Sequence, residues 1–179
     1  MPRFKLIPVL ALVGALVVGC GVDTDPVAVA PQVGEAAKAQ LVFEPAVGKP
    51  IVKFEGLVND GKPVSADLAS FDALPKQTLK VVEPFVKKSM TFTGVSFADL
   101  LNAAQATGRS VTVHALDDYE VTFKVAVLRD QGALLATAVG GKAIEMSAGG
   151  PVRLVFPASS KAGKDSDLWV WSIDKITVE

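Results

Sequence analysis

The chain has 179 residues and a formal net charge of −1 at neutral pH. This balance lacks the basic excess of nucleic-acid-binding domains, so no nucleic-acid partner is expected. Its single cysteine, Cys20, excludes an internal disulfide, and together with a single histidine it makes a zinc site improbable.

The first residues predict a targeting signal rather than part of a fold. Arg3 and Lys5 precede an apolar run over residues 6–18, and the letters VVGC end this run at Cys20. This ending resembles the lipobox of bacterial lipoproteins, in which the signal is cleaved before the cysteine and the cysteine is acylated. We therefore expect residues 1–19 to be a signal peptide and Cys20 to be the lipidation site that anchors the protein to a membrane.

Two other interpretations of this segment are a short transmembrane anchor and a secretory signal with an incidental cysteine. The apolar run of about 13 residues is shorter than the roughly 20 that span a bilayer. Acidic Asp23 and Asp25 follow it, in place of a basic stop-transfer cluster. These features favour a lipoprotein on the periplasmic side of a bacterial envelope, and Gly21 after the cysteine favours the outer membrane.

The sequence beyond the signal divides into a tether and one domain. Residues 20–38 hold the lipidated cysteine and a flexible tether, because they are rich in Ala, Val, Pro and Gly without periodicity. From residue 39 onward, short apolar runs alternate with turns, which predicts one domain over residues 39–179.

Within this domain, many short strands and few helices predict an α+β fold with a mixed sheet, because no βαβ rhythm is present. The clearest helix covers residues 97–108, with Ser96 as its N-cap and Asp99 at the reciprocal capping position. A shorter helix is predicted within residues 65–74. Gly140, Gly141 and Lys142 predict a hairpin turn rather than a phosphate loop. Strands are predicted at residues 51–58, 78–85, 90–95, 110–116, 119–125, 133–139, 152–156 and 169–178.

Four motifs occur in a characteristic order: FTGVSFADLL at residues 92–101, DDY at 117–119, GGPVRLV at 149–155 and WVWSIDKI at 169–176. Together they resemble the molybdopterin-binding domain of the sulfite oxidase type, over roughly residues 51–179. The resemblance implies this family's fold, and it makes molybdopterin a possible cofactor.

In catalytic members of that family, a cysteine thiolate ahead of the first motif ligates molybdenum. Here the corresponding residues 79–86 read LKVVEPFV and contain no cysteine. Valine or a hard carboxylate does not reproduce the charge donation of a soft thiolate. Asp118 and Val170 also replace the glycine and lysine that the family carries. No bound cofactor is therefore expected, no metal site is assigned, and no catalytic residue is named.

A family pocket implies candidate binding residues for a small anionic ligand. Arg153 either offers a fork to a phosphate or carboxylate, or pairs with a carboxylate at the edge of the core; we treat it as an exposed charge. His114 is either a pocket residue or a packed or solvated surface histidine. Trp169 and Trp171 are predicted on one face of the last strand, as core or pocket wall. The candidate pocket residues are His114, Tyr119, Arg153, Lys161 and Lys164.

The favoured function is a lipid-anchored periplasmic accessory that is not catalytic and that binds a small anionic ligand or a periplasmic protein partner. One alternative is a molybdopterin-dependent oxidoreductase whose metal lacks a protein thiolate. A second alternative is a purely structural envelope lipoprotein.

Overall fold

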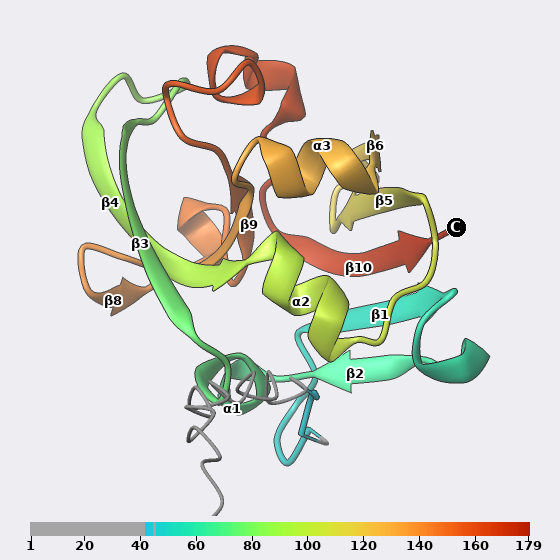
Figure 1. Cartoon of the computed structure of the whole chain (residues 1–179). Helices are drawn as coiled ribbons and strands as arrows, with labels where there is room; N and C mark the ends of the chain where they lie inside the picture. Colours follow the sequence, from blue (N-terminus) through green and yellow to red (C-terminus); the bar gives the residue numbers. More distant parts are fainter. Residues whose placement is uncertain (1–41, 45) are drawn as a thin grey trace, which may run out of the picture. The chain divides into compact units, whose positions relative to one another are not determined.

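The computed structural model describes residues 42–44 and 46–179 (Figure 1). The predicted signal peptide, Cys20 and the tether lie outside the described residues. Two β-sheets and three short α-helices make up the described part, which confirms the predicted α+β class. No helix within this part is long and apolar enough to cross a membrane.

The first sheet has five strands, and the strand that comes last in the chain lies at its centre. Strand β10 pairs in parallel with β1 and antiparallel with β5, while β2 and β6 occupy the two edges. In spatial order the strands are β2 (Val64–Ala66), β1 (Val52–Gly56), β10 (Ile173–Val178), β5 (Ser110–Ala115) and β6 (Glu120–Lys124).

The second sheet is antiparallel throughout. Strand β7 pairs with β4, β8 and β9, and the β7–β8 hairpin turns at Gly140 and Gly141 as predicted. The strands are β3 (Lys76–Val82), β4 (Ser89–Ser96), β7 (Leu134–Val139), β8 (Lys142–Ala143) and β9 (Arg153–Val155).

The helix α2 (Phe97–Ala103) begins where its cap predicts. The Ser96 hydroxyl accepts a hydrogen bond from the Asp99 amide at 3.0 Å and donates one to the Asp99 carboxylate at 2.7 Å. The helix ends earlier than predicted, because Gln105 takes a left-handed φ of 51° that no α-helix can continue. Short helix α1 (Leu68–Asp72) lies within the predicted range, and α3 (Val125–Asp130), which the sequence did not predict, lies beside α2 (Figure 1).

The last strand was predicted to begin at Trp169, and this start is wrong. Strand β10 begins at Ile173, because Ser172 has a φ of 50° and interrupts the extended conformation. The Ser172 amide instead bonds to the carbonyl of Gly149. The two tryptophans therefore lie on an irregular segment that precedes the strand.

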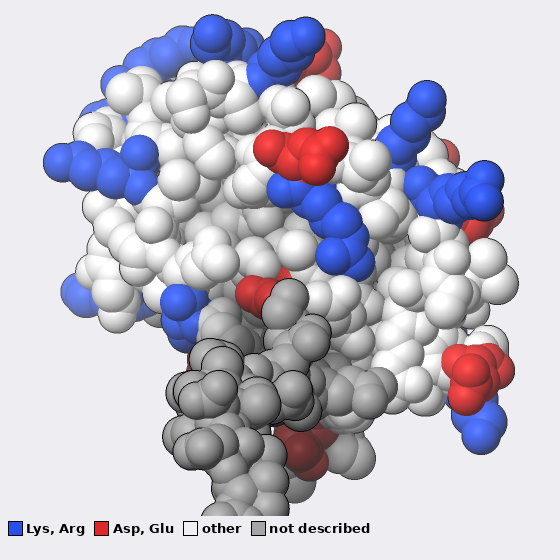
Figure 2. Space-filling model, in the orientation of Figure 1, with Lys and Arg blue, Asp and Glu red and all other residues white. Residues whose placement is uncertain are grey.

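Both sheets contribute to one hydrophobic core. On β5, Val111, Val113 and Ala115 are buried while the alternating residues are partly exposed, as the period of a strand requires. Helix α2 adds Leu100 and Leu101, which are almost completely buried, and each such side chain contributes about 1.5–3 kcal/mol. On the face shown in Figure 2, basic side chains lie mostly near the edge, and acidic groups stand beside several of them.

Asp67 caps α1 and predicts a dependence of stability on pH. Its carboxylate accepts hydrogen bonds from the amides of Ser70 at 2.8 Å, Gly48 at 2.6 Å and Val47 at 3.0 Å. These bonds, that of Ser70 first, lower the pKa of Asp67 from 3.8 to about 2. Since the folded-state pKa is the lower one, the carboxylate stabilises the fold above about pH 4, and this stabilisation disappears as the pH falls toward 2.

We therefore expect the thermal midpoint to fall more steeply between pH 4 and pH 2 in the wild type than in Asp67→Asn, whose side chain can still cap the helix. Thermal denaturation followed by circular dichroism at a series of pH values measures this. An equal fall of the thermal midpoint with pH in the wild type and in Asp67→Asn would show that Asp67 is not the source of the pH dependence.

Candidate functional site

The turn between β3 and β4 is fastened by a buried ion pair. Glu83 follows β3 directly and is fully buried, and its carboxylate accepts a hydrogen bond from the Arg153 guanidinium at 2.9 Å. Its other oxygen accepts bonds from the amides of Phe85 at 2.8 Å and Val86 at 2.7 Å. Both oxygens of this carboxylate are thus engaged within the protein.

The prediction that Arg153 is an exposed charge is wrong. Arg153 starts β9 and is 3% exposed, because its guanidinium lies between aromatic rings in the protein interior. It is 3.8 Å from the ring centre of Trp171 and 5.5 Å from that of Phe92, within the range of cation–π attraction. Burial lowers the pKa of Arg153, while the charge of Glu83 opposes this shift. Of the two roles considered for Arg153, the structure shows the pairing with a carboxylate.

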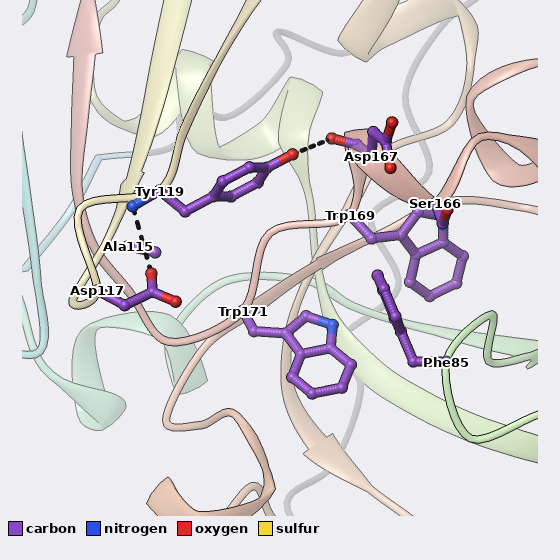
Figure 3. Close-up of a pocket in the computed structure, with 8 residues that line it drawn as sticks. All are labelled: Phe85, Ala115, Asp117, Tyr119, Ser166, Asp167, Trp169 and Trp171. Atoms are coloured by element: carbon purple, nitrogen blue, oxygen red, sulfur yellow. Dashed lines mark hydrogen bonds between the residues drawn. The ribbon is translucent and has the colours of Figure 1, made fainter.

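A cavity of about 310 Å³ opens beside Trp171 (Figure 3). Three segments far apart in the chain form it: the β3–β4 turn, the β5–β6 turn, and the stretch that runs from the 3₁₀ helix η4 (Ser166–Leu168) toward β10. Aromatic rings dominate its wall, and among the described residues the charged side chains that line it are carboxylates. The lining residues are Phe85, Ala115, Asp117, Tyr119, Ser166, Asp167, Trp169 and Trp171.

A hydrogen bond and ring packing join the walls of the cavity. The Tyr119 hydroxyl donates to the backbone carbonyl of Asp167 at 2.5 Å, which joins two segments 48 residues apart (Figure 3). Phe85 packs edge-on against Trp171, with ring centres 5.1 Å apart. These contacts indicate a largely pre-formed binding site.

Three buried N–H groups beside the cavity have no acceptor among the described residues: Nε of Arg153 and the indole nitrogens of Trp169 and Trp171. A buried donor without a partner costs about 1–3 kcal/mol. Such a concentration of unpaired polar groups is more typical of a functional site than of a core chosen for stability alone.

Of the five residues predicted to form the pocket, only Tyr119 lines this cavity. His114 points to the other face of β5, where its ring nitrogens lie 3.0 Å from the Glu120 carboxylate and 3.2 Å from the Thr177 hydroxyl. Arg153 is buried over the Trp171 ring and does not line the cavity. The side chains of Lys161 and Lys164, at the 3₁₀ helix η3 (Ala162–Lys164), are exposed and do not line it.

The sequence did predict Trp169 and Trp171 as core or pocket wall, and both line the cavity. It missed Phe85 and Asp167. Phe85 was predicted at the end of a strand, but β3 ends at Val82 and Phe85 lies in the turn that follows. Asp167 lies in the 3₁₀ helix η4, which the sequence did not predict. Asp117 belongs to the DDY motif, so its neighbour Tyr119 was the signal that could have identified it.

Comparison with known proteins decides the family. A family model described as the oxidoreductase molybdopterin binding domain matches residues 78–178. The chain belongs to this family. Its segment from β3 to β10, which forms every wall of the cavity, is therefore a molybdopterin-binding-type domain.

The fold of this molybdopterin-binding-type domain is also found among solved structures. The crystal structure of the sulfane dehydrogenase SoxCD from Paracoccus pantotrophus matches with a TM-score of 0.56 and 18% sequence identity. The match covers 71% of this chain and 37% of the SoxCD chain, so this chain spans well under half of that protein. At this identity the likeness concerns the fold. No curated protein matches the chain.

The residues present do not fit a molybdopterin whose metal is held by the protein. Residues 42–44 and 46–179 contain no cysteine and no group of three His, Asp or Glu side chains that could hold a metal ion. Glu83, the carboxylate nearest the end of β3, is engaged by Arg153 and two amides. Within the described part of the chain, the cavity is lined by carboxylates and by no basic side chain, which disfavours an anionic pterin phosphate.

Proposed function

We propose that this chain is a lipid-anchored protein on the periplasmic side of a bacterial envelope, and that its molybdopterin-binding-type domain binds a small ligand instead of performing molybdenum chemistry. The single observation that carries this proposal is the engagement of Glu83 with Arg153 at the end of β3.

The chemistry of that position supports the loss of catalysis. The family's catalytic members place a thiolate ahead of the motif that begins at Phe92, and this chain places valines and Glu83 there. A hard carboxylate is a poor substitute for a thiolate on high-valent molybdenum. Binding a metal would also require Glu83 to leave Arg153 as an unpaired buried charge, which costs several kcal/mol.

The cavity at Trp171 supports a binding function. It is concave, mostly aromatic and largely pre-formed, which are the usual properties of a small-molecule site. The sequence predicted an anionic ligand. Of the basic residues predicted to bind it, Lys161 and Lys164 are exposed, so an anion would bind at these two residues and not in the cavity. The lipid anchor and the outer-membrane location rest on the VVGC signal that ends at Cys20.

The test is the metal and pterin content of the full-length protein, extracted with detergent from membranes of its native host. We expect far less than one molybdenum per chain and no turnover of sulfite or sulfoxides, because no described residue supplies a thiolate. A catalytic member of the family produced in the same cells controls for cofactor supply.

About one molybdenum per chain would overturn the proposal in favour of the oxidoreductase alternative. Recovery of the mature chain without detergent would contradict the lipid anchor.

A further inference from the structure

We infer that the cavity at Trp171 binds a small organic cation of the quaternary ammonium class. This inference rests on the proposed binding function and specifies its ligand. It reverses the sign of the ligand charge that the sequence predicted, because the lining residues differ from the predicted ones.

The aromatic wall is the first argument. The rings of Phe85, Tyr119 and Trp171 come from three separate segments and meet at one cavity (Figure 3). Phe85 and Tyr119 are 53% and 43% exposed, which is unusual for large aromatic side chains that could pack in a core. The faces of aromatic rings attract alkylated ammonium groups, and cages of such rings are a common means of recognising them. Because the Arg153 guanidinium already lies over the Trp171 ring, the exposed rings of Phe85 and Tyr119 are the ones left to attract a ligand cation.

The charges at the cavity are the second argument. Asp117 and Asp167 lie near opposite ends of the Tyr119 side chain (Figure 3). No basic residue lines the cavity among residues 42–44 and 46–179. The Asp167 carboxylate has no salt bridge or hydrogen bond to another described residue. The charge of the buried Arg153, which lies over the Trp171 ring, is compensated by Glu83. The charged lining side chains are therefore negative, which favours a cation. The unpaired indole N–H groups of Trp169 and Trp171 call in addition for an acceptor atom on the same ligand, such as the hydroxyl oxygen of choline.

The third argument separates an organic cation from a metal ion. A metal ion needs several oxygen, nitrogen or sulfur ligands, and the described residues form no suitable group of three. A volume of about 310 Å³ with mostly apolar walls suits a cation that carries its own methyl groups.

The protein contains two tryptophans, Trp169 and Trp171, and both line the cavity. Intrinsic tryptophan fluorescence therefore reports on this site directly, without a label. The full-length protein in detergent is titrated with choline, with its neutral isostere 3,3-dimethylbutan-1-ol, and with inorganic phosphate. Isothermal titration calorimetry on the same samples confirms that a fluorescence change reflects binding.

We expect saturable binding of choline, roughly tenfold weaker binding of the neutral isostere, and no binding of phosphate. Choline affinity is also expected to fall as the salt concentration rises, because both carboxylates are exposed to solvent.

Three variants assign the binding to this site. The double variant Asp117→Asn with Asp167→Asn keeps the shape and removes both charges, so choline should bind about tenfold more weakly. Tyr119→Leu removes one ring and should weaken binding several-fold. Asp60→Asn, in the 3₁₀ helix η1 (Asn59–Gly61), removes one negative charge outside the cavity and should leave the affinity unchanged. Thermal midpoints establish that each variant is folded.

Equal affinity for choline and its neutral isostere, binding of phosphate instead, or no saturation with choline would overturn the inference. The proposed function is tested separately: about one molybdenum per chain in the same preparation would overturn it, whatever the result with choline. If the protein contains no molybdenum and does not bind choline, the proposed ligand class is wrong but the proposed function still holds.

Discussion

Replacing Arg153 by alanine is expected to lower the free energy of unfolding by about 3–5 kcal/mol, because it leaves Glu83 as a buried, uncompensated charge. The Glu83 side chain is fully buried, and Arg153 is the basic side chain that pairs with it. The same substitution also removes the guanidinium that stacks on Trp171 at 3.8 Å. Urea denaturation monitored by circular dichroism gives the difference.

Two further variants separate charge from packing at this pair. Glu83→Gln keeps the shape of the side chain but should also be strongly destabilising, since it leaves Arg153 as a buried uncompensated charge and turns an amide NH2 group toward donors whose hydrogen bonds the carboxylate accepts. The double variant Arg153→Met with Glu83→Leu replaces both charges by apolar groups and should recover much of the lost stability. A loss below about 1 kcal/mol in Arg153→Ala would show that the pair is not a determinant of the fold.

Gly94→Ala is expected to destabilise the protein by about 3 kcal/mol or more, because no room exists for a methyl group at this position. A Cβ there would lie 2.0 Å from the carbonyl oxygen of Leu135 and 2.6 Å from the Cα of Ala136, both backbone atoms of β7. The pairing of β4 with β7 shifts register between Thr93 and Gly94, so the two strands approach closely at this point.

Thr93→Ala is the matched control for this strand. Its hydroxyl meets that of Thr78 at 3.4 Å on an exposed face, so its loss should cost no more than about 1 kcal/mol. Chemical denaturation of both variants measures the contrast. A Gly94→Ala protein as stable as Thr93→Ala would mean that β4 and β7 separate without cost.

The sequence predicted correctly those parts of the fold that depend on residues close to one another in the chain. The cap at Ser96, the hairpin at Gly140 and the alternation on β5 follow from short-range chemistry, and the structure shows all three. Helix α3 was missed because Val125 and Val127 favour strands, whereas tertiary packing of Leu128 determines the conformation there.

The site was predictable only in part, because its key contacts join distant segments. Glu83 and Arg153 are 70 residues apart, and nothing in either neighbourhood indicates that they pair. Arg153 precedes the apolar residues Leu154 and Val155 in a strand buried at every position, so its burial follows from the sheet and not from its own chemistry. The family motifs identified Tyr119 and the two tryptophans as part of the site. The remaining aromatic and acidic wall comes from Phe85, in the β3–β4 turn, and from Asp167, in η4.

The central place of β10 has a consequence for how the protein is made. Until residues 173–178 are available for pairing, the β1–β2 and β5–β6 pairs can each form, but no strand joins them. Each pair alone is only marginally stable in water. The first sheet can therefore be completed only after all of its other strands are available. Until then, the unpaired edges of β1 and β5 can form hydrogen bonds with the wrong strands.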